Sequence, residues 1–443
     1  MKSLINRSFV INYKIIILLI PLILSIFSGI FSQWFLSSGN SKLSNFIYQG
    51  EFVISSVYFV ILLFLCIYFY RFRGPFTKIE KFYLKLSIFF FFFSFISLSI
   101  SIANENPLKY IVSDYLRSQV FFIVLTSLIL FFNNKSSLLK ETFLKYLLII
   151  TFFSTFVGFI GKLALMSSGT FYGGGLNQFI PAIHVLVILI VYFTKIKFHW
   201  KKLALFMVIF LLIAFTVLSL KRGNWVSLIF IFFALNFFIQ KRTNLVILAI
   251  SLLSLGTLFL VYFDLIESIV NRFMSTFISS NGYMLGNSSS ARLAEIAGAI
   301  YTYSQIDVSL LYFVGSGNGA LYLLNPDFLV ETGRYSEANQ WIHHSHPMFN
   351  VLFIRNGIIG ILVYLSAILF LIKILFQTYK SYPKGVIVSN KYGIFFLAFG
   401  LEIANNLLMS AKSNAFYGSI YLGIITFAFI QSQVLFKKNL SMT

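Results

Sequence analysis

The longest polar segment of this chain reads SSSARLAEIAGAI at residues 288–300, VGSGNGA at 314–320 and HHSHPMFNVLFIRNGIIG at 343–360. On both sides of this segment the sequence consists of long hydrophobic runs separated by short basic connections. One polar segment in such an apolar chain predicts a single large loop outside a membrane, with the hydrophobic runs crossing the lipid. The fold class expected is an all-α polytopic membrane protein.

The composition also indicates that lipid surrounds most of the chain. Of the 443 residues, 58% are hydrophobic and only 11% are charged, and Phe alone accounts for 56. The mean hydropathy is +0.88. Soluble domains carry about 25% charged residues, so the shortage of charge excludes an ordinary soluble domain.

The charge, cysteine and motif content exclude several function classes. A net charge of +21 would suggest nucleic acid binding in a soluble protein. Basic residues accumulate in the cytoplasmic loops of membrane proteins, so no nucleic-acid partner is expected. The single cysteine, Cys66, excludes a disulfide framework and a Cys-based zinc site. No Asp-x-Asp pair, Walker pattern, HExxH motif or GxSxG elbow occurs, so we expect neither a metal nor a cofactor.

About 20 apolar residues make one helical span, and the sequence offers about twelve such runs. They lie near residues 15–33, 52–70, 84–102, 117–133, 143–161, 178–194, 203–220, 224–240, 244–263, 348–372, 392–410 and 416–436. With the N-terminus inside, most Lys and Arg residues fall on the cytoplasmic side and most acidic residues fall outside, as expected for membrane proteins. We therefore predict nine transmembrane helices in 1–263, an extracytoplasmic loop with short helices at 264–346, three more transmembrane helices in 347–443, and both termini in the cytoplasm.

His346 is the candidate catalytic residue at the end of the large loop, directly before Pro347 and an apolar run. A histidine on the outer face before a membrane helix can act as a general base, because the pKa of histidine lies near the working pH. An interfacial histidine that caps the start of a helix fits the same position. Spacing alone leaves both interpretations open.

Three basic residues are candidates for binding an anionic group. Arg222 lies in the tight turn LKRGNW beside Lys221, and a guanidinium held there suits bidentate recognition of a phosphate or pyrophosphate. Arg292 lies near the start of an expected helix capped by Ser289 or Ser290, where backbone N–H groups also favour an anion. The structural alternatives are an arginine that snorkels to lipid headgroups and a solvated charge on a helix face.

Further residues are candidates for supporting roles. The GSGNG stretch, with Gly317 and Gly319, would let backbone approach a ligand, and a plain turn is the alternative. Glu402 lies inside a predicted span, where an ionisable group either serves function or pairs with a basic residue to pack the bundle. Trp341 would stack on a sugar face, although aromatic residues are also expected at a membrane interface. His184 is expected to be a buried histidine with satisfied hydrogen bonds.

Together these residues resemble the O-antigen ligase and polymerase superfamily of bacterial envelope glycosyltransferases. Three parts match that family in the same order over about residues 215–365. They are Arg222-Gly223 in an outer turn, Ser290 with Arg292 at a helix start, and Gly315 to Gly319 followed by His346 and the Gly-x-x-Gly pair that ends at Gly360.

The resemblance implies a reaction. In that family the donor is a glycan carried on polyprenyl pyrophosphate at the outer side of the bacterial inner membrane, and no metal takes part. Carried onto this chain, Arg222 and Arg292, assisted by Lys221, would bind the pyrophosphate. His346 would take the proton from the acceptor hydroxyl. The implied protein is a polymerase of O-antigen, capsular polysaccharide or exopolysaccharide, with the lipid-linked glycan and the bilayer as partners and a chain-length regulator as a further candidate.

Two alternatives remain. Ligases of this family, which transfer finished polymer to lipid A core, typically carry Asn, Ser or Gln after the histidine, so Pro347 favours a polymerase. A flippase or transporter of the same lipid-linked glycan belongs to another class. Transporters usually have pseudo-symmetric halves and charges near the midplane, whereas this chain has no visible repeat and one dominant outer loop.

Overall fold

The computed structural model describes 74–167, 183–197, 199–218, 222–238, 287–304, 310–323, 341–343, 347–410 and 420–441, with Ser345 and scattered residues between Ile15 and Arg71. Inside helices, the side chains at 158–167, 214–215, 217–218, 222–225, 287–294 and 409–410 lie outside the description. The chain forms two compact units, which are Met1–Ile61 with Lys135–Phe179, and Leu62–Asn134 with Ile180–Thr443.

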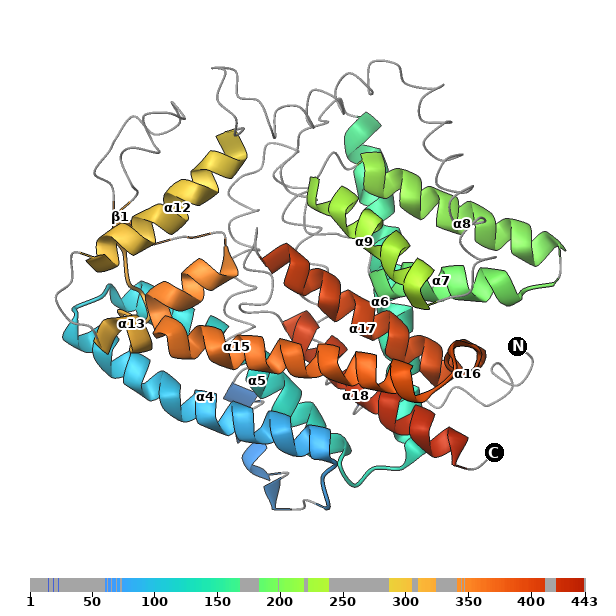
Figure 1. Cartoon of the computed structure of the whole chain (residues 1–443), viewed down its shortest axis with the longest axis horizontal. Helices are drawn as coiled ribbons and strands as arrows, with labels where there is room; N and C mark the ends of the chain where they lie inside the picture. The colour runs from blue at the N-terminus through green and yellow to red at the C-terminus, as the bar shows by residue number, and fades with distance from the viewer. Residues whose placement is uncertain are drawn as a thin grey trace. The chain divides into compact units, whose positions relative to one another are not determined.

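The described chain is mostly helical (Figure 1). The first unit holds α6 (Ser137–Ser167). The second unit holds, before the large loop, α4 (Lys78–Ala103), α5 (Leu108–Phe132), α7 (Ile183–Lys195), α8 (His199–Leu218) and α9 (Arg222–Phe238). It continues with α12 (Asn287–Ser304), α13 (Leu310–Val314), β1 (Tyr322–Leu323), β2 (Trp341–Ile342), α15 (Met348–Ser381), α16 (Lys384–Ser389), α17 (Lys391–Ser410) and α18 (Ile420–Leu440).

The predicted helical character is confirmed wherever the structure describes a predicted span. Among the described residues, four helices, α4, α5, α15 and α18, are long and apolar enough to cross a membrane, and two shorter apolar helices lie at Ile183–Lys195 and Val226–Phe238. The runs at 15–33, 52–70 and 244–263 lie largely outside the described residues. The total of twelve spans, the domain boundaries and the orientation stay predictions.

Helix α4 shows why this part of the sequence suits lipid. Thr77 and Glu80 form a capping box at its start, with Thr77 N donating to Glu80 Oε2 at 2.9 Å. Further along, the buried face consists largely of serines, while large apolar side chains are exposed. The buried serines are Ser87, Ser94, Ser97 and Ser101, and the exposed residues include Ile88, Phe89, Phe92, Phe95 and Ile96. Small residues let membrane helices approach closely, whereas an exposed apolar face this long would be unfavourable in water.

The helices of the second unit pack around α5, α17 and α18. Helix α18 lies against α5 and α17, and α17 also contacts α7, α9 and α15. Helix α15 lies along α4 (Figure 1). Tyr83 Oη of α4 donates to the carbonyl of Ala367 at 2.6 Å. Helix α15 is also bonded to α5, where Tyr364 Oη donates to the carbonyl of Ser118 at 2.9 Å. Buried tyrosines thus satisfy helix carbonyls across the bundle.

The GSGNG segment (315–319) is a tightly packed turn beside the end of α4 and the start of α5. Gly315, Gly317 and Gly319 all have positive φ, at 82°, 86° and 77°. This backbone favours glycine. A Cβ at Gly317 would lie 2.6 Å from Ser101 N, and one at Gly319 would lie 2.8 Å from Ile111 N. The turn that the sequence offered as the alternative to a ligand-binding segment is observed, and its close backbone approach is to α4 and α5.

A further glycine, outside the GSGNG turn, bends α15 near its start. Gly357 interrupts the helix with φ 60° and ψ −161°, and a Cβ there would lie 2.3 Å from the carbonyl oxygen of Phe313 on α13. The first of the two glycines in the Gly-x-x-Gly pair therefore makes a kink. This kink separates Met348–Asn356 from the long remainder of α15.

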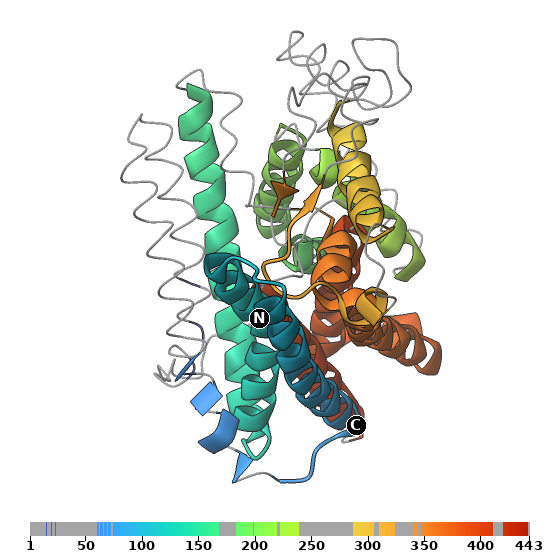
Figure 2. The ribbon, with the colours of Figure 1, turned by 90° about the vertical axis from the view of Figure 1, so that its left-hand side faces the viewer.

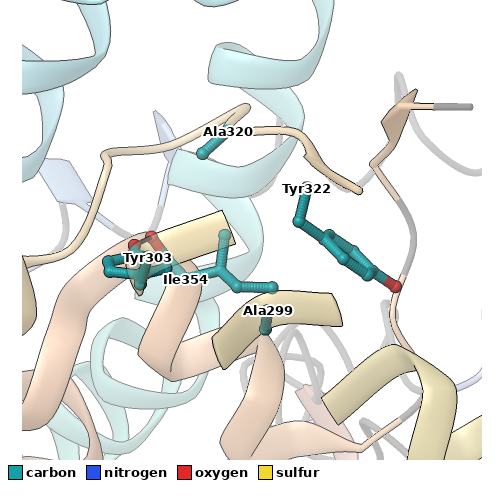
Figure 3. Close-up of a cluster of buried hydrophobic side chains, with 5 residues drawn as sticks. All are labelled: Ala299, Tyr303, Ala320, Tyr322 and Ile354. Atoms are coloured by element: carbon teal, nitrogen blue, oxygen red, sulfur yellow. Dashed lines mark hydrogen bonds between the residues drawn. The ribbon is translucent and has the colours of Figure 1, made fainter. Parts of the chain in front are cut away.

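Helix α12 and the two strands form a small structure over the start of α15. Tyr322 of β1 pairs antiparallel with Ile342 of β2. Ala299 and Tyr303 of α12 pack with Tyr322 and Ile354 in a buried cluster that also includes Ala320 (Figure 3). Figure 2 shows α12 beside the first turns of α15. The helix begins at Asn287, so Ser289 and Ser290 lie inside it and the cap expected at these serines is wrong.

The glycine turn predicts a specific sensitivity. Gly317→Ala should lower the free energy of unfolding by about 1–3 kcal/mol, because alanine would combine a disfavoured φ with a clash against Ser101. Thermal unfolding of the purified protein in detergent measures this change. The matched control is Gly385→Ala, since a Cβ there meets nothing within 4 Å. Equal unfolding temperatures for Gly317→Ala and wild type would contradict the role assigned to the turn.

Candidate functional site

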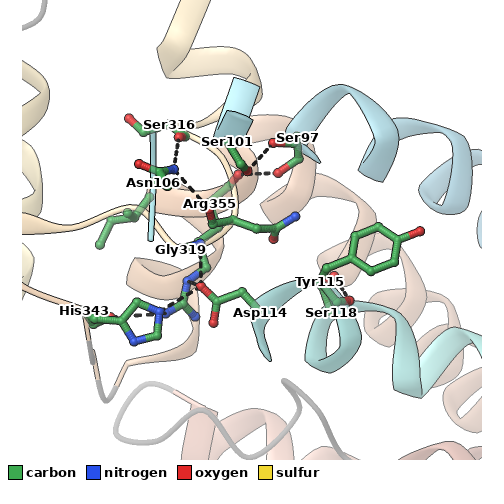
Figure 4. Close-up of polar contacts among 12 residues, drawn as sticks. Ser97, Ser101, Asn106, Asp114, Tyr115, Ser118, Ser316, Gly319, His343 and Arg355 are labelled. Atoms are coloured by element: carbon green, nitrogen blue, oxygen red, sulfur yellow. Dashed lines mark hydrogen bonds and ion pairs between the residues drawn. The ribbon is translucent and has the colours of Figure 1, made fainter. Parts of the chain in front are cut away.

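Asp114, in the second turn of α5, is the centre of a buried cluster of charged and polar groups (Figure 4). Its side chain is 0% exposed. The Oδ2 atom lies 2.6 Å from Arg355 Nε and 3.0 Å from His343 Nε2. The backbone N–H of Gly319 donates to the same oxygen at 2.8 Å. One carboxylate therefore joins α5, the glycine turn, the segment after β2 and the first part of α15.

Arg355 and His343 are fixed by further contacts. Arg355 Nη2 donates to the carbonyl oxygen of His343 at 3.1 Å. The imidazole of His343 stacks on the ring of Tyr110, with 4.0 Å between centroids and 11° between planes. Ser97 Oγ donates to the carbonyl of Arg355 at 2.9 Å, which ties α15 to α4 just before the kink. We call Asp114, His343 and Arg355 the charged cluster.

The connection between α4 and α5 fixes the glycine turn. Asn106 Nδ2 donates to the carbonyls of Ser316 at 3.1 Å and Asn318 at 3.0 Å. Asn104 Nδ2 reaches the same Ser316 carbonyl at 3.2 Å. These bonds satisfy carbonyl groups that no regular helix or sheet pairs, so the turn has one defined position beside Asp114.

Tyr303 of α12 closes the turn from the other side. Its hydroxyl donates to the carbonyl of Ile354 and accepts a hydrogen bond from Ser316 N at 2.8 Å. Burial raises the pKa of Tyr303 to about 12, while the hydrogen bonds with Ser316 act in the lowering direction. The hydroxyl therefore stays protonated at neutral pH and can donate to Ile354. This bond holds α12 against the start of α15.

Glu295 of α12 is bonded to the segment around the predicted catalytic histidine. Ser345 Oγ donates to Glu295 Oε2 at 3.3 Å, and Asn350 Nδ2 donates to the Glu295 carbonyl at 3.1 Å. Asn350 Nδ2 also donates to Ser345 Oγ at 2.8 Å. All three side chains are buried. Glu295 lies about one helical turn after Arg292, and Ser345 directly precedes His346, so α12 is fixed close to the residue before this histidine.

The predicted site residues differ in how far the structure describes them. His346 and Lys221 lie outside the described residues. Arg222 is the first residue of α9, which packs on α7, α8 and α17, and Arg292 lies in α12; the side chains of both arginines lie outside the description. Their assignment to a pyrophosphate stays a prediction.

Two predicted supporting features are described in full. Gly319 donates its N–H to Asp114, while Gly317 packs against Ser101, so both glycines serve the turn itself. Trp341 lies on β2 opposite Leu323, and it is 57% exposed. An exposed indole at this place is available to a partner.

Glu402 of α17 has histidine and backbone partners. Its Oε2 accepts from the backbone N–H of His184 at 3.0 Å and lies 3.2 Å from His184 Nδ1. Asn406 Nδ2 donates to Oε1 at 3.1 Å. His184 is the second residue of α7, where a negative charge is favourable next to unpaired helix N–H groups. The sequence left open which group pairs with Glu402, and the structure shows that it is His184 together with the N-terminus of α7. His184 itself is buried and hydrogen-bonded, as expected.

The charged cluster was not predicted from the sequence. Arg355 lies in the predicted span 348–372, where the rule that selected Glu402 should also have selected an arginine. Asp114 lies just before the predicted span 117–133, and His343 is the first of three histidines in four residues. Nothing in their spacing indicates that they meet. Among the residues that the structure describes, no three His, Cys, Asp or Glu side chains gather as a set of metal ligands.

Comparison with models of known protein families finds none that matches this chain, and comparison with curated proteins finds no similar sequence.

The charged cluster predicts a large effect of neutralising one partner. Asp114→Asn should lower the free energy of unfolding by about 3–5 kcal/mol, because the buried guanidinium of Arg355 loses its counter-charge. Thermal unfolding in detergent measures the loss. Glu105→Gln, an exposed carboxylate on the adjoining turn, is the matched control and should change stability by less than about 0.5 kcal/mol. Similar unfolding temperatures for the two variants would refute the structural role of Asp114.

The Glu402 contacts predict a graded response. Glu402→Leu should lower the free energy of unfolding by about 1–3 kcal/mol, since the buried N–H of His184 loses its acceptor. Glu402→Gln keeps an oxygen at this position and should lose less. The same unfolding measurement ranks the three proteins. If Glu402→Leu and Glu402→Gln unfold at the same temperature, the contact between the carboxylate and the start of α7 does not stabilise the protein.

Proposed function

We propose that this protein is a membrane glycosyltransferase that polymerises polyprenyl-pyrophosphate-linked oligosaccharide repeat units on the outer side of a bacterial inner membrane. The product is an O-antigen, capsular polysaccharide or exopolysaccharide. The proposal includes about twelve transmembrane helices and cytoplasmic termini. Its support is the sidedness of charge in the sequence, the apolar helices, and the ordered set of Arg222, Arg292 and His346.

One observation carries the proposal furthest, and it is the hydrogen-bonded contact between α12 and the segment before α15. Ser345 and Asn350 both bond to Glu295, and the three side chains are buried. The contact brings the helix that carries Arg292 to the residue before His346. A cation for a leaving pyrophosphate and a base for an incoming hydroxyl must lie within a few ångströms of one sugar, and this contact supports such an arrangement.

The proposed chemistry is a direct displacement at the anomeric carbon of the donor. The acceptor hydroxyl oxygen attacks this carbon while its proton passes to His346. The bond from the anomeric carbon to the pyrophosphate oxygen breaks, and the lipid-linked pyrophosphate leaves. Arg222 and Arg292, with Lys221, would stabilise the charge that grows on the leaving group. Stabilisation of this kind is worth about 3–4 kcal/mol for one well-placed donor, and general base catalysis contributes about 10²–10⁴-fold.

The proposal predicts the phenotype of three variants. A strain lacking the gene should be complemented by wild type, but His346→Ala, Arg222→Ala and Arg292→Ala should each reduce polymer formation about a hundredfold or more. Gel analysis of the polysaccharide ladder measures the result, with membrane levels of each variant compared by immunoblot. His199→Ala and Arg71→Ala replace exposed residues of the same types and should restore a normal ladder.

The pattern of products separates the candidate functions. A single repeat unit on the acceptor lipid, without the ladder, is the result expected for loss of a polymerase. Free polymer that accumulates on its carrier would indicate a ligase. A normal ladder from all three site variants would remove the catalytic assignment and leave a transporter of the lipid-linked glycan as the better explanation.

A further inference from the structure

The imidazole of His343 is held in one orientation with only one nitrogen used. Nε2 faces Asp114 at 3.0 Å (Figure 4). The ring of Tyr110 stacks on the imidazole. The backbone carbonyl of His343 is held by Arg355 Nη2 at 3.1 Å. The ring is therefore held by α5 at Nε2 and on one face, and the backbone of the same residue is held by α15. Among the described residues, Nδ1 has no hydrogen-bond partner.

The contacts decide which nitrogen of His343 can accept. A carboxylate only accepts, so the bond to Asp114 requires the hydrogen of the ring to be on Nε2. Arg355 Nη2 also lies 3.1 Å from Nε2. Two donors do not bond to each other, and Nη2 has the His343 carbonyl as its acceptor at the same distance. With the hydrogen on Nε2, a neutral imidazole presents Nδ1 as an acceptor.

Solvent reaches this histidine. Its side chain is 15% exposed, whereas that of Asp114 is 0% exposed. If His343 served only to join α5 to α15, the fold would be more stable with both ring nitrogens buried and hydrogen-bonded. The cluster instead orients one nitrogen with a buried carboxylate and leaves the other accessible. This is the arrangement by which proteins prepare a histidine to contact another molecule.

Trp341 provides a second observation that indicates a ligand. It lies two residues before His343, the spacing at which side chains of an extended segment share a face. Its indole is 57% exposed, although its backbone is fixed by pairing with Leu323. An exposed indole two residues before an oriented hydrogen-bond acceptor offers both contacts that a sugar needs. The ring covers the apolar C–H face of the sugar, and the acceptor takes a hydroxyl hydrogen.

We propose that His343 and Trp341 form a subsite for one sugar of the glycan, in which His343 Nδ1 accepts a hydrogen bond from a sugar hydroxyl and Trp341 stacks on the ring. The subsite rests on the proposed function for its substrate class. Asp114 and Arg355 are positioning residues, because they fix the tautomer and the place of His343 without reaching the sugar. The subsite lies three residues before His346, so it would hold a sugar next to the reacting group.

Two substitutions of His343 separate the contact with the sugar from the contact with Asp114. His343→Gln places an amide near the position of Nε2, so it keeps a donor to Asp114 but lacks an acceptor at the place of Nδ1. His343→Asn places its amide near the position of Nδ1 and loses the bond to Asp114. The glutamine variant loses only the stacking on Tyr110, so it should unfold slightly below the wild-type temperature. It should bind sugar about tenfold more weakly, the effect of one lost hydrogen bond. The asparagine variant should be less stable but should keep more of the affinity.

The probe is the oligosaccharide released by mild acid from the lipid carrier of a strain lacking the gene. Isothermal titration calorimetry of the full-length protein in detergent measures its binding without requiring polymerisation. Trp341→Ala, which leaves the charged cluster intact, should also weaken binding at least about tenfold. His199→Gln is the matched histidine control and should bind as wild type does.

Each outcome decides the proposal. Wild-type affinity in both His343→Gln and Trp341→Ala overturns the subsite and leaves His343 as a purely structural residue. If His343→Gln fails to fold, Trp341→Ala decides, and unchanged binding in that variant overturns the subsite. If wild type itself does not bind the oligosaccharide but still restores the ladder, the proposed function stands and the subsite is wrong. If wild type neither binds it nor restores the ladder, the proposed function fails and the subsite fails with it.

Discussion

The buried ion pair between Asp114 and Arg355 is the interaction on which this end of the molecule depends. An isolated charge in an apolar interior costs several kcal/mol, so each of these groups requires the other. Their 2.6 Å contact fixes the start of α5 against the first part of α15. The remaining acceptor capacity of Asp114 then holds Gly319 and His343. Four separate segments are positioned by one carboxylate.

Glycine makes this arrangement sterically possible. At Gly315, Gly317, Gly319 and Gly357 the backbone has positive φ and lies against the backbone or carbonyls of neighbouring segments. A side chain at any of these positions would push the turn or the α13–α15 contact apart. The backbone N–H of Gly319 could then not reach Asp114, and the kink after Asn356 could not form. The glycine pattern therefore determines where Arg355 and its partners can meet.

Two of the buried acidic residues, Glu402 and Asp114, have different surroundings, and the difference bears on function. Glu402 accepts from the start of α7, from the ring of His184 and from Asn406, so its contacts are those of an interhelical cap. Asp114 instead orients a histidine that solvent reaches, two residues after an exposed tryptophan. Burial of charge alone does not separate a structural acid from one that prepares a site. What separates them is whether the partner of the acid has an atom left for another molecule.

The sequence by itself determined the helices, because apolar runs of this length have no other stable form in lipid and their side chains need no particular partner. It also determined the turn at GSGNG, since alternate glycines favour a backbone that other residues avoid. The charged cluster was decided only by the tertiary structure. Asp114 and Arg355 are separated by 241 positions in the numbering, and their attraction depends on a distance that no local pattern records. The same holds for Glu402 and His184, whose pairing follows from the packing of α7 against α17.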